Sequence, residues 1–332
     1  MFLSIIIPVY NTKVYLIREC LDSLKKITLK KHQYQVIIVN DGSSDKDTIN
    51  YLSEISEKFT VINKKNGGLG SARNTGIKFA NGEYIFPLDS DDKIYDEFHF
   101  FIKELENNSD LDVLYGNSKK FGDENKLINQ RNFNKLTLFY QRNTLQACSF
   151  FKKTIWEKVQ GYDETFATIE DYDFWVRCSL NFAKFKYINY SSYEHRKILD
   201  GNSLLQRTQN IIHEYFEKID NKLPISRREF NQMFINSFEQ TSKKNIFKLI
   251  NHYYFNPKKK DRPTIFLFFV NTYYTNLNNS LVITKNELEE CLDFTFRRKK
   301  RKLIALALHL YLPKTYKFIS KTSLFSYNYN FI

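Results

Sequence analysis

The sequence has few cysteines and no long apolar run, and both absences narrow the class of protein. The four cysteines in 332 residues are widely spaced and none forms a CxxC pair, so we expect neither a disulfide framework nor a structural zinc site. No apolar run reaches the roughly 18–20 residues that a membrane span needs. The N-terminus lacks the charged segment and cleavage site of a signal peptide. We therefore expect a cytoplasmic protein whose cysteines are free thiols; they are Cys20, Cys148, Cys178 and Cys291.

Acidic residues are scarce in the second part of the chain. Residues 1–200 contain 28 Lys and Arg against 27 Asp and Glu, whereas residues 201–332 contain 22 against 10, so the net charge of +13 divides into +1 and +12. Such asymmetry indicates that the second part faces an anionic partner, either a membrane surface or a nucleic acid.

Four short apolar runs in the first 90 residues predict strands, at 4–9, 34–39, 60–63 and 84–88. Amphipathic segments between them predict helices, so the pattern is that of a doubly wound α/β fold. We expect Asn11 or Thr12 to cap the first helix and Asp45 to cap the second. Beyond about residue 205 the strand pattern stops and aromatic helical stripes follow. The sequence thus predicts an α/β domain over 1–205 and a mainly helical, basic region over 206–332.

Polar residues follow each of the four predicted strands, at 10–11, 41–42, 66–73 and 89–92. The carboxyl ends of parallel strands share one edge of a sheet, and ligands of open α/β sheets bind there. We therefore expect these four clusters to form one site.

The cluster Asp89-Ser90-Asp91-Asp92 places three carboxylates within four residues. Such carboxylates repel one another unless a cation lies among them, and hard oxygen ligands suit Mg²⁺ or Mn²⁺. A solvated acidic turn is the alternative interpretation.

The stretch Gly67-Gly68-Leu69-Gly70 resembles part of a dinucleotide fingerprint, but Arg73 occupies the place of its last glycine, and a P-loop is also absent. Glycines before a helix still offer N–H groups to a phosphate, and Arg73 adds positive charge. Asp41 either bonds a base or ribose or is an Asx-turn residue. Glu170 and Asp171 either complement a helix dipole or include a general base.

Taken together and in order, these motifs resemble family 2 glycosyltransferases of the GT-A fold, of the type that builds bacterial cell-surface glycans. The resemblance covers roughly residues 3–205. It rests on Ile6-Ile7-Pro8-Val9-Tyr10-Asn11, Val39-Asn40-Asp41-Gly42-Ser43-Ser44-Asp45, Asn66-Gly67-Gly68 with Ala72-Arg73-Asn74, Leu88-Asp89-Ser90-Asp91-Asp92, and Glu170-Asp171.

The resemblance implies a metal-dependent, inverting transfer of a sugar from a UDP-sugar to a hydroxyl of a glycan or lipid-linked acceptor. It implies Mn²⁺ or Mg²⁺ at Asp91, with Asp89 contacting ribose or the metal. It also implies that Asp171 is the catalytic base, with Glu170 beside it. The implied nucleotide-sugar contacts are Pro8, Tyr10, Asn11, Asp41 at the uracil edge, Lys65, Asn66, Arg73, Asp89 and Ser90.

One stretch departs from the family pattern. Many relatives carry an Arg-x-His element after the last strand, but here His195 precedes Arg196. We consider His195 a third metal ligand, against the alternative of a packed or surface histidine; Arg196 or Lys197 could instead supply positive charge.

The basic second region suggests peripheral attachment to the inner face of the cell membrane. Residues 297–302 are six consecutive cations followed by an apolar stretch, so 297–313 is a candidate interfacial segment. Nucleic acid is not expected, since no RNA-binding signature is present. A solvated helical domain is the remaining interpretation.

Two other functions compete with sugar transfer. A nucleotidyltransferase also uses paired acids, but it needs a glycine-rich loop after the first strand, where this chain has Pro8-Val9-Tyr10-Asn11. A non-catalytic binding module on the same fold would not need both Asp91 and Asp171. The sequence specifies neither the donor sugar nor the acceptor, linkage or oligomeric state.

Overall fold

The computed structural model describes residues 1–141, 145–198, 207–208, 210–226, 229–230, 232–234, 270 and 285–298. Contacts divide the chain into two units. The first comprises Met1–Phe133 and Thr144–Glu217, and the second comprises Asn134–Asn143 and Lys218–Ile332. The predicted division at residue 205 stays a prediction.

The first unit is built on a mixed sheet of nine strands among the described residues, in the order β3-β2-β1-β4-β8-β6-β9-β5, with β7 paired to β6. Strands β1 to β4 are mutually parallel, as predicted, whereas β8 runs antiparallel to β4 and β6. The strands are β1 Leu3–Val9, β2 Tyr34–Asp41, β3 Thr60–Lys64, β4 Tyr84–Pro87, β5 Lys93–Ile94, β6 Val113–Gly122, β7 Lys126–Ile128, β8 Phe150–Lys152 and β9 Phe185–Lys197.

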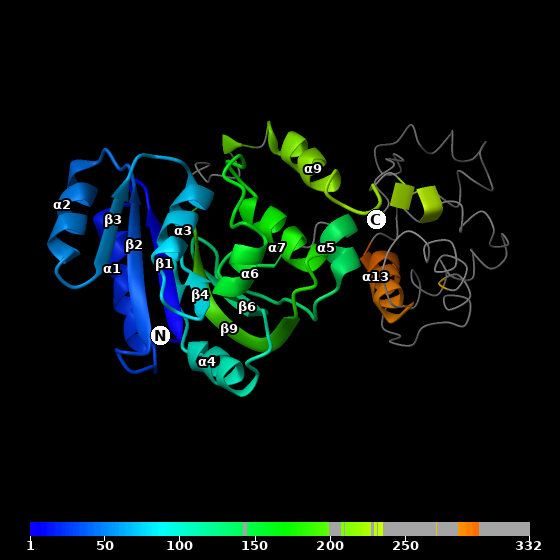
Figure 1. Ribbon diagram of the computed structural model, residues 1–332, viewed down its shortest axis with the longest axis horizontal. Helices are drawn as coiled ribbons and strands as arrows, with labels where there is room; N and C mark the ends of the chain where they lie inside the picture. Colours follow the sequence, from blue (N-terminus) through cyan, green and yellow to red (C-terminus); the bar gives the residue numbers. More distant parts are fainter. Residues whose placement is uncertain are drawn as a thin grey trace. The chain divides into compact units, whose positions relative to one another are not determined.

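In the first unit, helices follow the strands as the apolar periodicity predicts, and the ribbon shows them flanking the sheet (Figure 1). The predicted cap at Asp45 is confirmed, because its side chain accepts from the Thr48 N–H. The helices are α1 Val14–Ser23, a 3₁₀ turn Leu24–Lys26, α2 Lys46–Ile55, α3 Leu69–Lys78, α4 Phe98–Asn107, α5 Lys135–Gln141, α6 Lys153–Lys158, α7 Glu170–Leu180, α9 Ile212–Asp220 and α13 Lys285–Arg298.

The two faces of the sheet are covered by different helices. On one face, side chains of α1, α2 and α4 pack with alternate residues of β1, including Ile5 and Ile7, in one apolar cluster. On the other face, α3 packs on β1 and β2. A Cβ at Gly76 of α3 would lie 2.5 Å from Ile6 Cγ2 and 3.0 Å from Val39 Cγ2, so this helix lies very close to the sheet. Burial on both faces explains why β1 reads as an uninterrupted apolar run.

The expected cap of the first helix is wrong. Lys13 is the N-cap of α1 and makes no side-chain cap hydrogen bond. Asn11 instead has a left-handed backbone, with φ of 50°, and its Oδ1 accepts from the backbone N–H groups of Ser44 and Asp45. Thr12 bonds the Ser90 hydroxyl at 2.8 Å. Both polar side chains therefore tie loops of the polar sheet edge together.

Two strands are not marked by apolar runs along their whole length. Strand β9 runs to Lys197 because its second half pairs with β6 and β5. The two-residue strand β5 follows the acidic cluster and had no apolar run to mark it. His195 and Arg196 therefore lie on a strand beside the acidic cluster.

The second unit is described only in part. Within it, α13 contacts α5, and the rings of Tyr140 and Phe230 stack at 3.8 Å. Residues 299–313 of the candidate interfacial segment lie outside the described residues. In the part of the chain that the structure describes, no helix combines the length and apolarity needed to cross a bilayer.

Candidate active site

The polar clusters after β1, β2, β3 and β4 lie at one edge of the sheet, because these strands are parallel neighbours. The predicted shared edge is therefore present, and the prediction that the clusters form one site stays a prediction. The contacts of each cluster show how its side chains are held.

Arg196 of β9 anchors the acidic cluster from the neighbouring strand. Its backbone N–H donates to Asp92 Oδ1 at 2.8 Å, and its Nε donates to the carbonyl of Asp91 at 2.9 Å. The guanidinium also pairs with Glu19 at 2.6 Å and lies over the ring of Phe121. Arg196 thus holds the backbone of the acidic loop without forming an ion pair with the Asp91 carboxylate.

The charge of Arg196 acts on the Asp91 carboxylate but does not outweigh the effects of burial and of Asp89. Burial, followed by the charge of Asp89, raises its pKa to about 6. Among the described residues no Lys or Arg forms an ion pair with it. A half-buried carboxylate without a cationic partner beside a second carboxylate is the donor set that a hard divalent cation prefers.

Arg73 joins the acidic cluster to the start of α7. Its Nη2 pairs with Asp89 Oδ1 at 2.8 Å and its Nη1 with Glu170 Oε1 at 2.5 Å, while only 1% of the side chain is exposed. The guanidinium also lies over the ring of Tyr162. Burial opposes the charge of Arg73, but the two carboxylates raise the pKa of the guanidinium above its usual value. Arg73 therefore connects the start of α7, where the catalytic base is predicted, directly to the acidic cluster, where the donor is predicted to bind.

Asp171 follows Glu170 in the first turn of α7. The preceding residue, Ile169, has a left-handed backbone with φ of 54°, which turns the chain sharply into the helix. Burial, and next the charge of Glu170, raises the pKa of Asp171 to about 7, although the charge of Arg73 opposes the shift. Its Oδ1 accepts from the Tyr172 N–H at 2.8 Å. Such a pKa suits a general base at neutral pH.

Asp41 holds the glycine loop that follows β3. Its carboxylate accepts from the backbone N–H groups of Gly67 and Gly68, at 3.0 and 2.9 Å, and pairs with Lys64 Nζ at 2.7 Å. Only 3% of Asp41 is exposed. Lys65 and Asn66, between these contacts, are exposed. Asp41 is thus tied to the loop, and its contacts are not those of an Asx turn.

The remaining predicted nucleotide contacts lie at the end of β1 and in the acidic cluster. Pro8 is buried within β1, whereas the ring of Tyr10 is 55% exposed at the sheet edge. Asn11 and Ser90 bridge this end of β1 to the neighbouring loops through the contacts given above.

His195 shares none of these hydrogen bonds, although the charge of Asp89 acts on its ring: desolvation lowers the pKa of His195 and Asp89 opposes that shift. It lies on β9 in register with Lys120 of β6, and its ring is exposed. Among the described residues its ring makes no hydrogen bond; its near neighbour is the ring of Tyr193, at 6.4 Å. Its predicted role as a metal ligand therefore stays a prediction.

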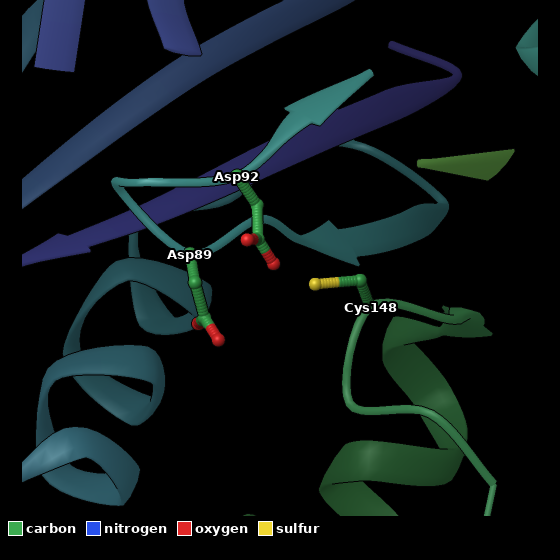
Figure 2. Close-up of side chains that lie close together, drawn as sticks. All are labelled: Asp89, Asp92 and Cys148. Atoms are coloured by element: carbon green, nitrogen blue, oxygen red, sulfur yellow. The ribbon is translucent and has the colours of Figure 1, made fainter. Parts of the chain in front are cut away.

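Two contributors to the site escaped the sequence reasoning. Asn74 of α3 clamps the segment before α7, since its side chain bonds both backbone polar groups of Tyr162 and the carboxylate of Glu164. Cys148 lies beside Asp89 and Asp92, as Figure 2 shows. Asn74 sits in the Ala-Arg-Asn motif and could have been suspected, whereas nothing in the sequence marks Cys148.

Comparison with known proteins agrees with this geometry. The family model described as "Glycosyl transferase family 2" matches residues 4–168. Residues 4–168 therefore belong to glycosyltransferase family 2. The family 2 domain contains four of the five motif clusters, and Glu170 and Asp171 follow it directly.

Curated relatives of the family 2 domain include enzymes of polysaccharide synthesis. The chain is 32% identical to a chondroitin synthase of Pasteurella multocida over 206 residues, which are 60% of this chain and 21% of that protein. It is 44% identical to a poly(ribitol-phosphate) beta-glucosyltransferase of Bacillus spizizenii over 124 residues, 35% of this chain and 19% of that protein. The chain thus spans about a fifth of the length of these relatives.

Solved structures with the same fold include S. aureus TarS 1–349. The complex of TarS with UDP has a TM-score of 0.55 at 19% identity, covering 97% of this chain and 91% of that one. The complex with UDP-GlcNAc has a TM-score of 0.57 at 19% identity, covering 97% and 92%. These likenesses confirm the predicted GT-A fold: a mixed sheet flanked by helices.

Proposed function

We propose that this protein transfers a sugar from a UDP-sugar to a hydroxyl of a glycan or lipid-linked acceptor in cell-surface polysaccharide synthesis, with inversion at the sugar carbon. The observation that carries the proposal is the buried Arg73, which bonds both Asp89 and Glu170. It brings a carboxylate cluster suited to a metal–diphosphate next to a carboxylate suited to proton removal. Binding of UDP-GlcNAc by TarS supports a UDP-sugar as the donor.

The acidic cluster would hold Mn²⁺ or Mg²⁺ through Asp91, with Asp89 beside it. The lack of an ion pair at Asp91 among the described residues and its pKa of about 6 fit such a cation. When bound, the cation supplies a Lewis acid that neutralises charge on the diphosphate leaving group. His195 is the third proposed ligand.

Asp171 would accept the proton of the acceptor hydroxyl. As that oxygen bonds to the sugar carbon, the bond from this carbon to the diphosphate breaks and UDP leaves with the electron pair. Attack from the side opposite the leaving group inverts the carbon, and no covalent enzyme intermediate is needed. General-base assistance of this kind contributes roughly 10²–10⁴ in rate. Glu170 stays paired with Arg73, and its negative charge keeps the pKa of Asp171 raised against the charge of Arg73.

The nucleotide would bind along the ends of β1, β2 and β3. Tyr10, whose ring is exposed, would stack on the base, and Asp41 would bind the uracil edge. Because Asp41 also bonds Gly67 and Gly68, base binding and the order of that loop would be linked. Pro8, Asn11, Lys65, Asn66 and Ser90 complete the proposed pocket.

The protein would work at the inner face of the cell membrane, held peripherally by its basic C-terminal region. The charge of residues 201–332, 22 Lys and Arg against 10 Asp and Glu, supports this placement. Sedimentation with anionic liposomes at low salt is the expected result. Equal recovery with neutral liposomes would contradict the membrane proposal.

Release of UDP from UDP-glucose, UDP-galactose, UDP-GlcNAc and UDP-GalNAc, with and without Mn²⁺, tests the proposed reaction. Asp171→Asn should abolish transfer and hydrolysis while UDP affinity, measured by calorimetry, stays within about twofold of the unmodified protein, because the base does not contact the nucleotide. Loss of UDP binding in this variant would contradict the role given to Asp171.

A further inference from the structure

A buried thiol lies against the inner side of the acidic cluster. One carboxylate oxygen each of Asp89 and Asp92 and the Cys148 Sγ all lie within 4.8 Å of one another. In Figure 2 the sulfur points at the Asp92 carboxylate from the segment that leads into β8. Cys148 comes from a part of the chain remote from the acidic loop, so the fold itself creates this group.

The three side chains retain unused ligand atoms. Arg73 bonds Asp89 Oδ1 and the Arg196 backbone bonds Asp92 Oδ1, and among the described residues neither Oδ2 accepts a hydrogen bond. Only 2% of Cys148 is exposed, and its sulfur has a hydrogen bond with the backbone of Asp89. A buried thiol close to two carboxylates is a ligand set of mixed hard and soft character.

We propose that Asp89, Asp92 and Cys148 form a second cation site that takes a thiophilic divalent ion such as Zn²⁺, Cd²⁺ or Co²⁺. Thiolate ligands select such ions, whereas Mg²⁺ and Mn²⁺ prefer oxygen. Binding exchanges the thiol proton, released to solvent, for the metal–sulfur bond.

The distances between the three ligand atoms would suit a small ion once the side chains move slightly closer together. Zinc bonds of about 2.3 Å to sulfur and 2.0–2.2 Å to oxygen in a tetrahedron place neighbouring ligand atoms roughly 3.5 Å apart. The present separations, up to 4.8 Å, require the side chains to approach by about an ångström. Water would supply the fourth ligand, as at zinc sites with three protein ligands.

This site shares Asp89 with the cation proposed for catalysis but does not use Asp91. A thiophilic ion bound there would draw the Asp89 carboxylate away from Arg73 and from the donor metal. Zn²⁺ should therefore inhibit sugar transfer even when Mn²⁺ is present. Ion binding itself does not rest on the proposed transferase activity.

Titration of the full-length, metal-free protein with Co²⁺ tests the site directly. A thiolate-to-cobalt charge-transfer band in the near ultraviolet should appear with one equivalent of ion and disappear when Zn²⁺ is added. Cys148→Ser should abolish the band. Cys20→Ser is the matched control, since Cys20 is also buried and lies 3.7 Å from the Asp89 carbonyl, yet it does not belong to the three side chains whose ligand atoms lie within 4.8 Å of one another.

Absence of the band in the unmodified protein, or its persistence in Cys148→Ser, would overturn the proposal. Asp92→Asn should weaken Co²⁺ binding at least tenfold; unchanged affinity would count against the assigned ligand set. If Cys148→Ser does not fold, zinc-edge X-ray absorption of the unmodified protein decides the question. One sulfur neighbour supports the site and an all-oxygen shell overturns it.

Discussion

The guanidinium of Arg73 contacts the Glu170 carboxylate at 2.5 Å, across 97 residues of sequence. This pair fixes the start of α7 against α3, and through Asp89 the same guanidinium reaches the acidic loop. Rigid support of this kind keeps a catalytic base and a cation at the leaving group in fixed positions relative to each other.

Arg73→Met should destabilise the protein by about 3–5 kcal/mol, because it leaves two carboxylates without their buried partner. Urea unfolding followed by circular dichroism measures the loss. Arg18→Met is the control: Arg18 is exposed over the Tyr51 ring, so its loss should cost less than about 1 kcal/mol.

The losses of stability caused by mutating Arg73 and Glu170 should not be additive. Arg73→Met combined with Glu170→Gln should cost less than the sum of the two single changes, because the second change removes a stranded charge. Strict additivity would show that Arg73 and Glu170 are not coupled.

The pH dependence of transfer should follow Asp171. Its pKa of about 7 means that the base is protonated, and the reaction slow, at pH 5–6, and that the rate rises as pH passes through about 7. A profile of kcat against pH at saturating donor and Mn²⁺ checks this. A profile flat between pH 5 and 8 would contradict the assignment of Asp171 as the base.

The raised pKa of Asp171 should also make the stability of the folded protein depend on pH. The folded pKa of Asp171 lies above the unfolded value of about 3.9, so the folded state binds more protons between pH 4 and 7. Protonation of Asp171 therefore stabilises the folded state fully below pH 4, and this stabilisation is lost as pH rises through 7. Asp171→Asn should make stability less dependent on pH in this window, as unfolding at several pH values would reveal.

Asp91→Asn should raise the melting temperature of the metal-free protein at pH 8, because it removes a buried charge that Asp89 repels. The same change should abolish the stabilisation by Mn²⁺, since a neutral amide is a much weaker ligand for a hard cation. Thermal scans with and without Mn²⁺ measure both effects. Asp110→Asn, on the exposed surface beside Lys184, should leave both unchanged.

Gly76→Ala should destabilise the domain by about 1–3 kcal/mol, because its Cβ would lie 2.5 Å from Ile6 Cγ2 and force α3 off the sheet. Gly70→Ala, in the same helix, is the matched control. Its Cβ would meet Glu170 Cγ at 3.5 Å, an ordinary contact, so the change should be neutral or stabilising through helix propensity. Equal losses in urea unfolding would contradict the close packing of α3.

Much of this fold could be predicted from local sequence. The apolar runs of β1 and β2 and the cap at Asp45 are determined by neighbouring residues, and the parallel order of the strands places the polar clusters at one edge. The acidic cluster was recognisable because three carboxylates stand together in the chain.

The contacts that organise the site could not be predicted in this way. From the sequence, Arg73 was predicted to bind phosphate. Its ion pair with Glu170 exists only because the tertiary fold brings the two residues together. Cys148 meets Asp89 through the antiparallel strand β8, whose short sequence gives no sign of its neighbours. The second half of β9 is polar, so pairing with β6 and not hydrophobicity determines its length.

The position of Arg196 has a consequence for biosynthesis. The acidic loop, at residues 89–92, leaves the ribosome long before the strand that anchors it, because Arg196 lies more than a hundred residues later. Until that strand is translated, the nascent chain has β1 to β4 and the Arg73 partner of Asp89, but it lacks the Arg196 contacts that hold Asp91 and Asp92. The competent site can therefore assemble only after nearly the whole domain has emerged.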